Sequence, residues 1–179
     1  MKPGPLFYVV GPSGAGKDSV IAWARAASDP ARIAFAHRYI TRPATPDAEN
    51  HVALSVDEFE ARRRRGWFAL HWRSHGLSYG IGREIDLWQA AGIAVVINGS
   101  RAYLAEAAAL YPELRPVLIT APAEVREARL RARRRETGAA LAERLDSHLA
   151  IDHPRLATID NSGELRRAGR ALSDLLRQA

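Results

Sequence analysis

The sequence predicts an α/β fold of three layers, in which helices cover both faces of a central parallel sheet. Short apolar runs alternate along the chain with segments of helical periodicity, and this alternation is typical of parallel sheets. The apolar runs, which we expect to form strands, are Leu6–Val10, Ile33–His37, Ile93–Ile97, Val117–Thr120 and Ala157–Asp160. The segments with helical periodicity are Lys17–Ala27, Ile85–Ala91, Ala102–Leu110, Pro122–Arg135, Ala139–Ile151 and Glu164–Arg177.

Length and composition favour a single domain spanning residues 1–179, with 47% hydrophobic and 26% charged residues. The chain has no cysteine, which excludes disulfides and thiolate metal sites. The sequence shows no signal peptide, and no apolar run approaches the ~20 residues needed to span a membrane. We therefore expect a cytoplasmic protein that does not bind membranes.

The charge of the chain is a weaker guide to function. The net charge is +6, and only Lys2 and Lys17 among the 26 basic residues are lysines. A basic chain can bind nucleic acid, but it can equally bind small polyanions. The run Arg62-Arg63-Arg64-Arg65 ends a short predicted helix. We favour a solvated helix end that complements the helix dipole over a nucleic-acid patch, and we expect no nucleic-acid partner.

A glycine-rich segment directly follows the first apolar run and directly precedes a helical pattern. Its residues, which we expect to bind ATP, are Gly11, Pro12, Ser13, Gly14, Ala15, Gly16 and Lys17. In a phosphate-binding loop the glycines let backbone N–H groups face the nucleotide, and the lysine reaches the β- and γ-phosphates. An ordinary glycine-rich turn is the alternative, but the flanking strand and helix favour the phosphate loop, with Lys17 as a catalytic cation.

The position after Lys17 is unusual for such a loop. A Ser or Thr normally stands there and its hydroxyl binds Mg²⁺, whereas this chain has Asp18 followed by Ser19. A carboxylate is also a hard oxygen ligand, so we expect Asp18 to act through Mg²⁺, directly or through a bound water. Ser19 could donate to the α-phosphate. The alternative is that Asp18 only favours the helix N-terminus electrostatically.

The region from Thr41 to Gly82 does not follow the strand–helix alternation. It contains Pro43 and Pro46, a capping-box pattern at residues 55–58 that starts a short helix, and then Trp67–Trp72 as a predicted strand. Ligands bind at the carboxyl edge of open α/β sheets, and this region resembles an insertion on that edge. We expect Trp67, Trp72 and Trp88 to be core residues rather than ligand platforms.

A second arginine cluster, Arg129, Arg131 and 133–135, ends the helix before Thr137-Gly138, and Arg144 follows on the next predicted helix. Two helices joined by an arginine-rich loop can close over transferring phosphates, neutralise their charge and exclude water. We expect a lid at about residues 130–145 and catalytic roles for Arg133, Arg135 and Arg144. The alternative is a surface helix that happens to be rich in arginine.

These segments together resemble the guanylate kinase branch of the P-loop kinases, over nearly the whole chain. The resembling segments are Gly11–Lys17, Thr41-Arg42-Pro43, Gly76, Tyr79-Gly80, Arg83, Arg129-Leu130, Arg133, Arg144-Leu145 and Asp160-Asn161. The resemblance implies a guanylate kinase-like P-loop NTPase fold with an acceptor-binding insertion at about 38–83 and an Arg-rich lid. It also implies that Tyr79 and Arg83 hold the acceptor phosphate, and that Asn161 lies beside the adenine of ATP.

The chain departs from guanylate kinases where they recognise the guanine base. Leu70 replaces a glutamate that reads the guanine edge, and Ile81 replaces a Ser or Thr that helps to read the base. Thr45 replaces a second acceptor-motif arginine, and Asn98 replaces an acidic residue after the central strand. A site without these acceptors would leave the base unpaired, which removes selectivity for guanine.

This combination resembles a narrower family, the ribose 1,5-bisphosphate phosphokinases of phosphonate breakdown. The matching segments are Lys17-Asp18-Ser19, His37-Arg38-Tyr39-Ile40-Thr41-Arg42, Glu49-Asn50-His51-Val52-Ala53-Leu54-Ser55, Gly76-Leu77-Ser78-Tyr79-Gly80, Glu84-Ile85-Asp86-Leu87-Trp88 and Asn98-Gly99-Ser100-Arg101-Ala102. The resemblance implies transfer of phosphate from ATP to ribose 1,5-bisphosphate, giving 5-phosphoribosyl 1-diphosphate (PRPP). We expect the acceptor to be bound by Arg38, Thr41, Arg42, Glu49, His51, Tyr79, Arg83, Asn98 and Arg101.

Two other functions stay open at this stage. A nucleoside monophosphate kinase would keep the same phosphate chemistry with another base. A catalytically silent binding module of the same fold would usually have lost the phosphate loop, whereas Gly11, Gly16 and Lys17 are present. Transfer of the γ-phosphate of ATP would separate an enzyme from such a module.

Overall fold

The computed structural model describes residues 2–43, 51–132 and 151–178. Its main sheet has five strands in the order β2-β7-β1-β8-β9, and all neighbouring pairs are parallel. The strands are β1 (Leu6–Val10), β2 (Ile33–Phe35), β7 (Ala94–Asn98), β8 (Arg115–Thr120) and β9 (Ala157–Asp160). All five predicted strands are therefore present, although β2 ends at Phe35 because the chain enters a second sheet at Arg38.

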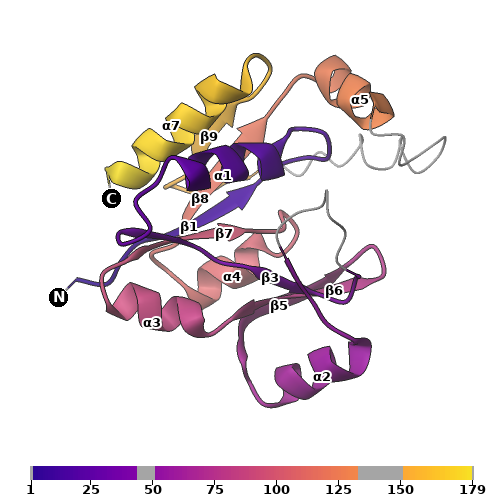
Figure 1. Cartoon of the computed structure of the whole chain (residues 1–179), viewed down its shortest axis with the longest axis vertical. Helices are drawn as coiled ribbons and strands as arrows, with labels where there is room; N and C mark the ends of the chain where they lie inside the picture. Colours follow the sequence, from indigo (N-terminus) through magenta and orange to yellow (C-terminus); the bar gives the residue numbers. More distant parts are fainter. Residues whose placement is uncertain (1, 44–50, 133–150, 179) are drawn as a thin grey trace.

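Helices cover both faces of this sheet, which confirms the three-layer prediction (Figure 1). One face carries α1 (Lys17–Ala26) and α7 (Leu165–Arg177), and the other carries α3 (Glu84–Ala90) and α4 (Leu104–Leu110). Strand β1 lies in the middle of the sheet and is buried along its whole length. Its alternate residues face opposite layers, as the two-residue period of a strand requires: Phe7 packs toward α1 and α7, and Tyr8 toward α3 and α4.

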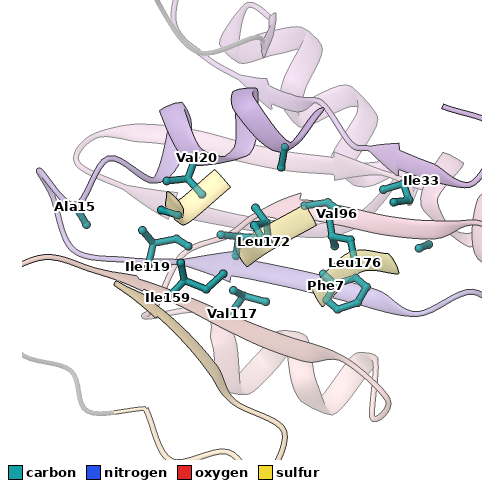
Figure 2. Packing of buried hydrophobic residues seen from close by; sticks show 14 residues of the cluster. Phe7, Ala15, Val20, Ile33, Val96, Val117, Ile119, Ile159, Leu172 and Leu176 are labelled. Carbon is teal, nitrogen blue, oxygen red and sulfur yellow. The ribbon is translucent and has the colours of Figure 1, made fainter. Parts of the chain in front are cut away.

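The core between the sheet and the α1–α7 layer is made of aliphatic side chains around Phe7 (Figure 2). Leu172 and Leu176 of α7 lie against Val96 and Val117 of the sheet. The two helices approach closely because α7 has a glycine at their contact, where a Cβ on Gly169 would lie 2.4 Å from the indole ring of Trp23. Full burial of each large aliphatic side chain contributes about 1.5–3 kcal/mol, so this layer anchors the helix that follows the phosphate loop.

The second sheet has four strands in the order β4-β3-β6-β5. Its strands are β3 (Arg38–Ile40), β4 (His51–Ala53), β5 (Phe68–Ser74) and β6 (Leu77–Gly82), and helix α2 (Val56–Arg64) connects β4 to β5. Strands β5 and β6 form an antiparallel hairpin whose turn has His75 and Gly76 at positive φ. The sequence predicted α2 and most of β5 but missed the other three strands, because two have only three residues and β6 contains two glycines.

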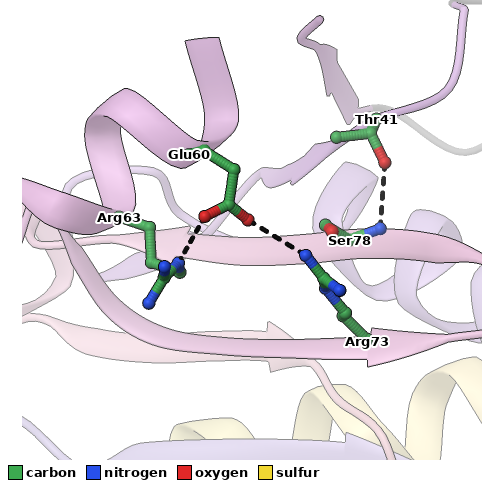
Figure 3. Close-up of polar contacts among 5 residues, drawn as sticks. All are labelled: Thr41, Glu60, Arg63, Arg73 and Ser78. Carbon is green, nitrogen blue, oxygen red and sulfur yellow. Dashed lines mark hydrogen bonds and ion pairs between the residues drawn. The ribbon is translucent and has the colours of Figure 1, made fainter. Parts of the chain in front are cut away.

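Hydrogen bonds and ion pairs join α2 and the strands of the small sheet (Figure 3). The capping box is confirmed, since Glu58 N–H donates to Ser55 Oγ at 3.1 Å. Glu60 accepts from Arg63 at 2.8 Å and from Arg73 of β5 at 3.3 Å. Such exposed pairs are individually worth under about 1 kcal/mol.

The arginine run at the end of α2 is partly occupied in local contacts. Arg62 pairs with Glu58 at 2.6 Å, and Arg65 lies over the ring of Trp67 at 5.3 Å from its centroid. These contacts fit the solvated helix end that we favoured. Trp67 itself is 52% exposed, so the prediction of a core tryptophan is wrong at this position, while Trp72 and Trp88 do pack against the core.

Several predictions fall on positions that lie outside the described residues. Helix α5 is described over Ala123–Ala132, which covers most of the predicted helix Pro122–Arg135. The predicted helix Ala139–Ile151 lies outside apart from its last residue, as do the predicted site residues Glu49, Arg133, Arg135 and Arg144. No helix among the described residues is long and apolar enough to cross a membrane.

Candidate active site

A cavity of about 390 Å³ opens between the phosphate loop, the small sheet and the segment that follows β7. The loop supplies Gly11 to Gly14 and Gly16 to Asp18. The small sheet supplies Arg38, Trp72 and Tyr79, and residues 99–102 close a third side. The strands of the main sheet are parallel, so β1 and β7 both end at this edge. The cavity therefore lies where the sequence predicted a ligand site.

The loop backbone requires its glycines. Gly14 and Gly16 have φ of 79° and 80°, a left-handed conformation that residues with a Cβ rarely adopt. A Cβ on Gly14 would lie 2.7 Å from the carbonyl oxygen of Arg126, and one on Gly11 would lie 2.6 Å from that of Ile119. Helix α1 begins at Lys17 with no side-chain cap among the described residues. Its first N–H groups can therefore bind phosphate oxygens.

Lys17, Asp18 and Asn98 form a hydrogen-bonded cluster at the floor of the cavity. The Lys17 ammonium donates to Asn98 Oδ1, and to Asp18 Oδ1 at 3.2 Å. Asn98 Nδ2 in turn donates to Asp18 Oδ1 at 2.8 Å. Asn98 is the last residue of β7 and is buried. The structure thus places Asn98, which we predicted as an acceptor residue, beside Lys17 and Asp18, where it hydrogen-bonds to both charged groups.

The cluster keeps Asp18 ionised. Burial among protein atoms would raise the pKa of this carboxyl group, but the positive charges of Lys17 and Arg38 and the hydrogen bond from Asn98 outweigh it. The pKa of Asp18 is consequently lowered to about 2. The Asp18 side chain is still 47% exposed, because it borders the open cavity. It is thus a charged oxygen donor that a ligand in the cavity can reach.

A stack of aromatic rings forms the wall opposite the loop. Tyr79 lies parallel to Trp72 with ring centroids 5.5 Å apart, and Trp72 stacks on Tyr103 at 5.6 Å. The guanidinium of Arg38 lies over the ring of Tyr79 at 5.2 Å from its centroid. Cation–π contact with a ring that is itself stacked on a second ring helps to hold the arginine in place. Arg38 therefore presents a cation to the cavity on a rigid support.

The third side of the cavity depends on a buried tyrosine. The Tyr8 hydroxyl donates to the Ser100 carbonyl oxygen at 3.2 Å and accepts from Ser100 N–H at 3.1 Å. Burial raises the pKa of Tyr8, so its hydroxyl stays protonated. This pair of bonds fixes the segment that carries Arg101 on the cavity wall. Sequence reasoning missed Tyr8, because an apolar strand gives no sign that one of its residues forms hydrogen bonds to the loop after another strand.

Asn161 lies behind the phosphate loop and is only 3% exposed. Its side-chain amide donates to the Ala15 carbonyl oxygen at 2.8 Å. Arg129 donates to the Asn161 carbonyl oxygen at 2.8 Å and to the Ala15 carbonyl oxygen at 3.4 Å. Both residues support the loop from behind, and the expected place of Asn161 beside the adenine of ATP stays a prediction.

Other predicted acceptor residues lie in or next to the small sheet without lining the cavity. Thr41 ties β3 to β6, since its Oγ1 accepts from Ser78 N–H at 2.9 Å (Figure 3). The His51 Nε2 lies 3.3 Å from the carbonyl oxygen of Arg42. Arg83 donates to the Gly66 carbonyl oxygen at 2.6 Å and pairs with Asp86 at 3.2 Å. Of the predicted acceptor residues, Arg38, Tyr79 and Arg101 line the cavity.

Comparison with known proteins identifies the family. No protein-family model matches the chain. The chain is 54% identical to the ribose 1,5-bisphosphate phosphokinase PhnN of Thiobacillus denitrificans, over 100% of this chain and 96% of that protein. It is 52% identical to the protein of the same name in Desulfomicrobium baculatum, over 96% of this chain and 93% of that protein.

Comparison with solved structures addresses the fold alone. The guanylate kinase of Anaplasma phagocytophilum superposes with a TM-score of 0.71 at 16% identity, over 99% of this chain and 87% of that one. The guanylate kinase-like P-loop fold expected from the sequence is thus confirmed. With about half of its residues identical to named relatives along its whole length, the chain belongs to the ribose 1,5-bisphosphate phosphokinase family.

Proposed function

We propose that this enzyme transfers the γ-phosphoryl group of ATP to the 1-phosphate of α-D-ribose 1,5-bisphosphate, giving PRPP and ADP. The named relatives support this activity. The single structural observation that carries the proposal is a cavity with a phosphate loop on one side and Arg38 and Arg101 on the others, to which the described part of the chain adds no base-reading wall. Such a cavity suits an acceptor that carries phosphates and no nucleobase.

The two positions where guanylate kinases read guanine are closed to any ligand here. Leu70 and Ile81 face each other across β5 and β6, and both are 0% exposed. They pack in the core with Tyr8 and Ile85. A base edge at this place would meet apolar side chains, which leave its hydrogen-bonding groups unpaired. This packing disfavours the alternative of a guanylate kinase.

The proposed reaction needs positioning and charge neutralisation more than acid–base catalysis. A phosphate monoester has its second pKa near ~6, so the attacking oxygen of the 1-phosphate carries no proton at neutral pH. That oxygen bonds to the γ-phosphorus as the bond from the γ-phosphorus to the β–γ bridging oxygen breaks, and ADP leaves with the electron pair. We assign Lys17 and the loop N–H groups to the donor phosphates.

The acceptor side is assigned to the cations of the cavity wall. Arg38 and Arg101 would bind the two phosphates of the sugar, with Tyr79 supporting Arg38. Thr41, Arg42, His51 and Arg83 would order the small sheet around them. We keep two further assignments that come from the sequence alone. Glu49 would bind the acceptor, and the three arginines of the proposed lid, Arg133, Arg135 and Arg144, would be catalytic. We propose further that residues 1–179 act as one domain.

Asp18 fits the Mg²⁺ ion that ATP-dependent kinases use. It is an ionised carboxylate that borders the cavity next to Lys17. Proteins usually hold Mg²⁺ through one or two carboxylates together with substrate phosphates. When bound, the ion would neutralise charge on the donor phosphates. Asp18 would then hold it directly or through a water, while Asn98 keeps the carboxylate oriented.

Phosphorus NMR of the purified protein with Mg-ATP tests the proposal. Ribose 1,5-bisphosphate, ribose 5-phosphate and GMP are offered in parallel. We expect a new sugar diphosphate signal from the first alone, since the second lacks the accepting 1-phosphate and the third needs a base reader. Formation of GDP would establish the nucleotide kinase instead. Consumption of none of the three would favour a binding module.

A further inference from the structure

One peptide group of the phosphate loop is held from behind by two side chains. The carbonyl oxygen of Ala15 accepts from Asn161 Nδ2 at 2.8 Å and from Arg129 Nη1 at 3.4 Å. Asn161 is itself fixed, because its N–H donates to the Thr120 carbonyl oxygen at 2.8 Å and its carbonyl oxygen accepts from Arg129 Nη2 at 2.8 Å. The end of strand β8, helix α5 and the loop therefore meet at this one carbonyl group.

The Asn161 side chain serves the loop through its donor alone. It is 3% exposed, and its Oδ1 is buried without a hydrogen-bond partner among the described residues. An unpaired buried oxygen lowers stability. A leucine would have the same branched shape without that oxygen, so packing by itself does not require an asparagine here. The next loop residue leaves room for the amide, since a Cβ on Gly16 would lie 2.5 Å from Asn161 Nδ2.

The direction of the Ala15 carbonyl group decides where the next N–H group points. In a planar trans peptide the C=O and the N–H point to opposite sides, and the described part of the chain has no cis peptide bond. Because the Ala15 carbonyl is turned toward Asn161, the Gly16 N–H is turned the other way, toward the cavity that Gly16 lines. Among the described residues no backbone acceptor takes up this N–H, whereas the Ala15 N–H donates to the Pro12 carbonyl oxygen at 3.2 Å.

We propose that Asn161 and Arg129 are positioning residues for ATP, which together hold the peptide between Ala15 and Gly16 so that the Gly16 N–H donates to a phosphate of the nucleotide. Such a bond is charge-assisted and depends on alignment. A peptide that already points the right way saves reorganisation when the nucleotide binds. The inference deepens the proposed function and rests on it only in that the loop binds the phosphates of ATP.

Two substitutions remove the donors one at a time. Asn161→Leu keeps the branched shape of the side chain, and Arg129→Met keeps most of its length. The matched controls are Ser162→Ala, at the exposed neighbour of Asn161, and Arg170→Met, which removes an exposed arginine of α7. Calorimetry measures the binding of a non-hydrolysable ATP analogue and of ribose 1,5-bisphosphate. Competition with the analogue measures the binding of inorganic tripolyphosphate, which has the phosphates without the adenine.

We expect Asn161→Leu and Arg129→Met to bind tripolyphosphate about 10-fold more weakly, because a hydrogen bond to a charged group is weakened. The ATP analogue should lose at least as much, and ribose 1,5-bisphosphate should bind as before. Arg129→Lys should restore part of the affinity, since an ammonium can still donate to the Ala15 carbonyl oxygen. In NMR spectra of the wild type, tripolyphosphate should move the Gly16 amide proton downfield, and Asn161→Leu should reduce that shift.

Three results overturn the proposal. A loss for the ATP analogue without a loss for tripolyphosphate would mean that Asn161 only contacts the adenine. Equal losses for all three ligands would mean a general structural role. Unchanged affinities in both variants would mean that the loop keeps its shape without these donors.

A variant that does not fold leaves the test intact. If Asn161→Leu fails to fold, Arg129→Met decides, because Arg129 is only partly buried. The measurements are of binding, so they hold even if ribose 1,5-bisphosphate is not turned over. Failure of the proposed reaction is therefore distinguished from failure of the positioning role. A wild-type protein that does not bind tripolyphosphate would overturn both the phosphate loop and its positioning residues.

Discussion

The two sides of the cavity are built in different ways. On the loop side, glycines lie against backbone atoms of neighbouring strands and helices, and Asn161 and Arg129 bond the loop from behind. On the acceptor side, short strands carry a stack of side chains, and the turn at Gly76 faces open space. In the function that we propose, recognition of the donor phosphates would therefore depend on backbone packing, whereas recognition of the acceptor would depend on side chains.

This difference predicts how substitutions act on the two sides. A change at Leu70 or Ile81 replaces one side chain on a sheet and leaves the loop as it is. A change in the loop backbone would disturb strands β1 and β8 and helix α5 together. Phosphate binding should therefore tolerate fewer substitutions than acceptor choice, and the following predictions test this contrast.

The largest effect should come from Lys17→Ala. Removing a preorganised cation from the transferring phosphate should lower kcat by at least ~10³-fold. The fold should persist, because the side chain borders the cavity rather than the core. Steady-state kinetics and thermal unfolding measure the two effects. Lys2→Ala is the matched control, since it removes the only other lysine at an exposed terminus. Turnover near the wild-type rate in Lys17→Ala would contradict the assignment of the loop.

The contrast between backbone and side chains is tested most directly by two glycine substitutions. Gly14 and Gly76 have similar positive φ values, 79° and 74°, so alanine is strained at both by about 1–2 kcal/mol. Only at Gly14 would the new Cβ also lie 2.7 Å from a backbone oxygen. Gly14→Ala should therefore lower stability by about 1–3 kcal/mol more than Gly76→Ala does, and it should lose most activity. Urea unfolding and kinetics compare them. Equal losses of stability in the two variants would show that the loop adapts to the added Cβ.

The main sheet could be predicted from sequence because its strands are apolar runs such as Leu6–Val10. Strands buried on both faces have this signature, and only a parallel α/β sheet repeats it between helices. The small sheet could not be predicted from sequence, because β3 and β4 have only three residues each, and a strand of three residues is too short to show a two-residue period. Strand β6, with glycines at 80 and 82, reads as a turn. The sheet forms because tertiary pairing with β5 overrides this local signal.

The candidate site, like the fold, could be predicted from sequence only in part. The loop is a local motif, so sequence alone identified Gly11 to Lys17 and the unusual Asp18. Residues that act from behind the cavity carry no local signal. The sequence does not distinguish Arg126 from the other two arginines of α5, Arg129 and Arg131, yet Arg126 is buried. Asn161 follows a strand at the expected ligand edge, yet its side chain supports the loop. Such roles depend on contacts between segments that are distant in sequence.

A smaller effect is expected from Tyr8→Phe, which removes the two hydrogen bonds to Ser100 and little volume. A fully buried backbone donor or acceptor left unpaired costs about 1–3 kcal/mol. The Ser100 groups are only partly buried, so stability should fall by about 1 kcal/mol, at the low end of that range. Because this segment carries Arg101, the KM for the sugar acceptor should rise more than the KM for ATP. Phe7→Leu, on the opposite face of β1, is the control: it should lower stability without changing the ratio of the two KM values. An unchanged ratio in Tyr8→Phe would show that Ser100 does not position Arg101.

The smallest effect concerns the pH dependence of stability through Asp18, measured with chelator so that no Mg²⁺ binds. Its folded pKa of about 2 lies below the ordinary value of 3.8. The folded protein therefore binds this proton more weakly than the unfolded chain. The resulting stabilisation is complete above about pH 5 and is lost as the pH falls through 4 toward 2. Because the carboxylate is half-exposed, solvent screening should keep this contribution below about 1 kcal/mol.

Asp18→Asn should remove that dependence while keeping the shape of the side chain. The stability difference between wild type and variant, from urea unfolding, should be largest at neutral pH and should vanish near pH 2. Asp174→Asn removes a carboxylate from the surface of α7 and reports what the loss of one exposed charge does alone. A difference that stays constant from pH 7 to pH 2 would mean that Lys17, Arg38 and Asn98 do not act on this group. The loop side would then be held by its backbone alone, without the charged cluster at its floor.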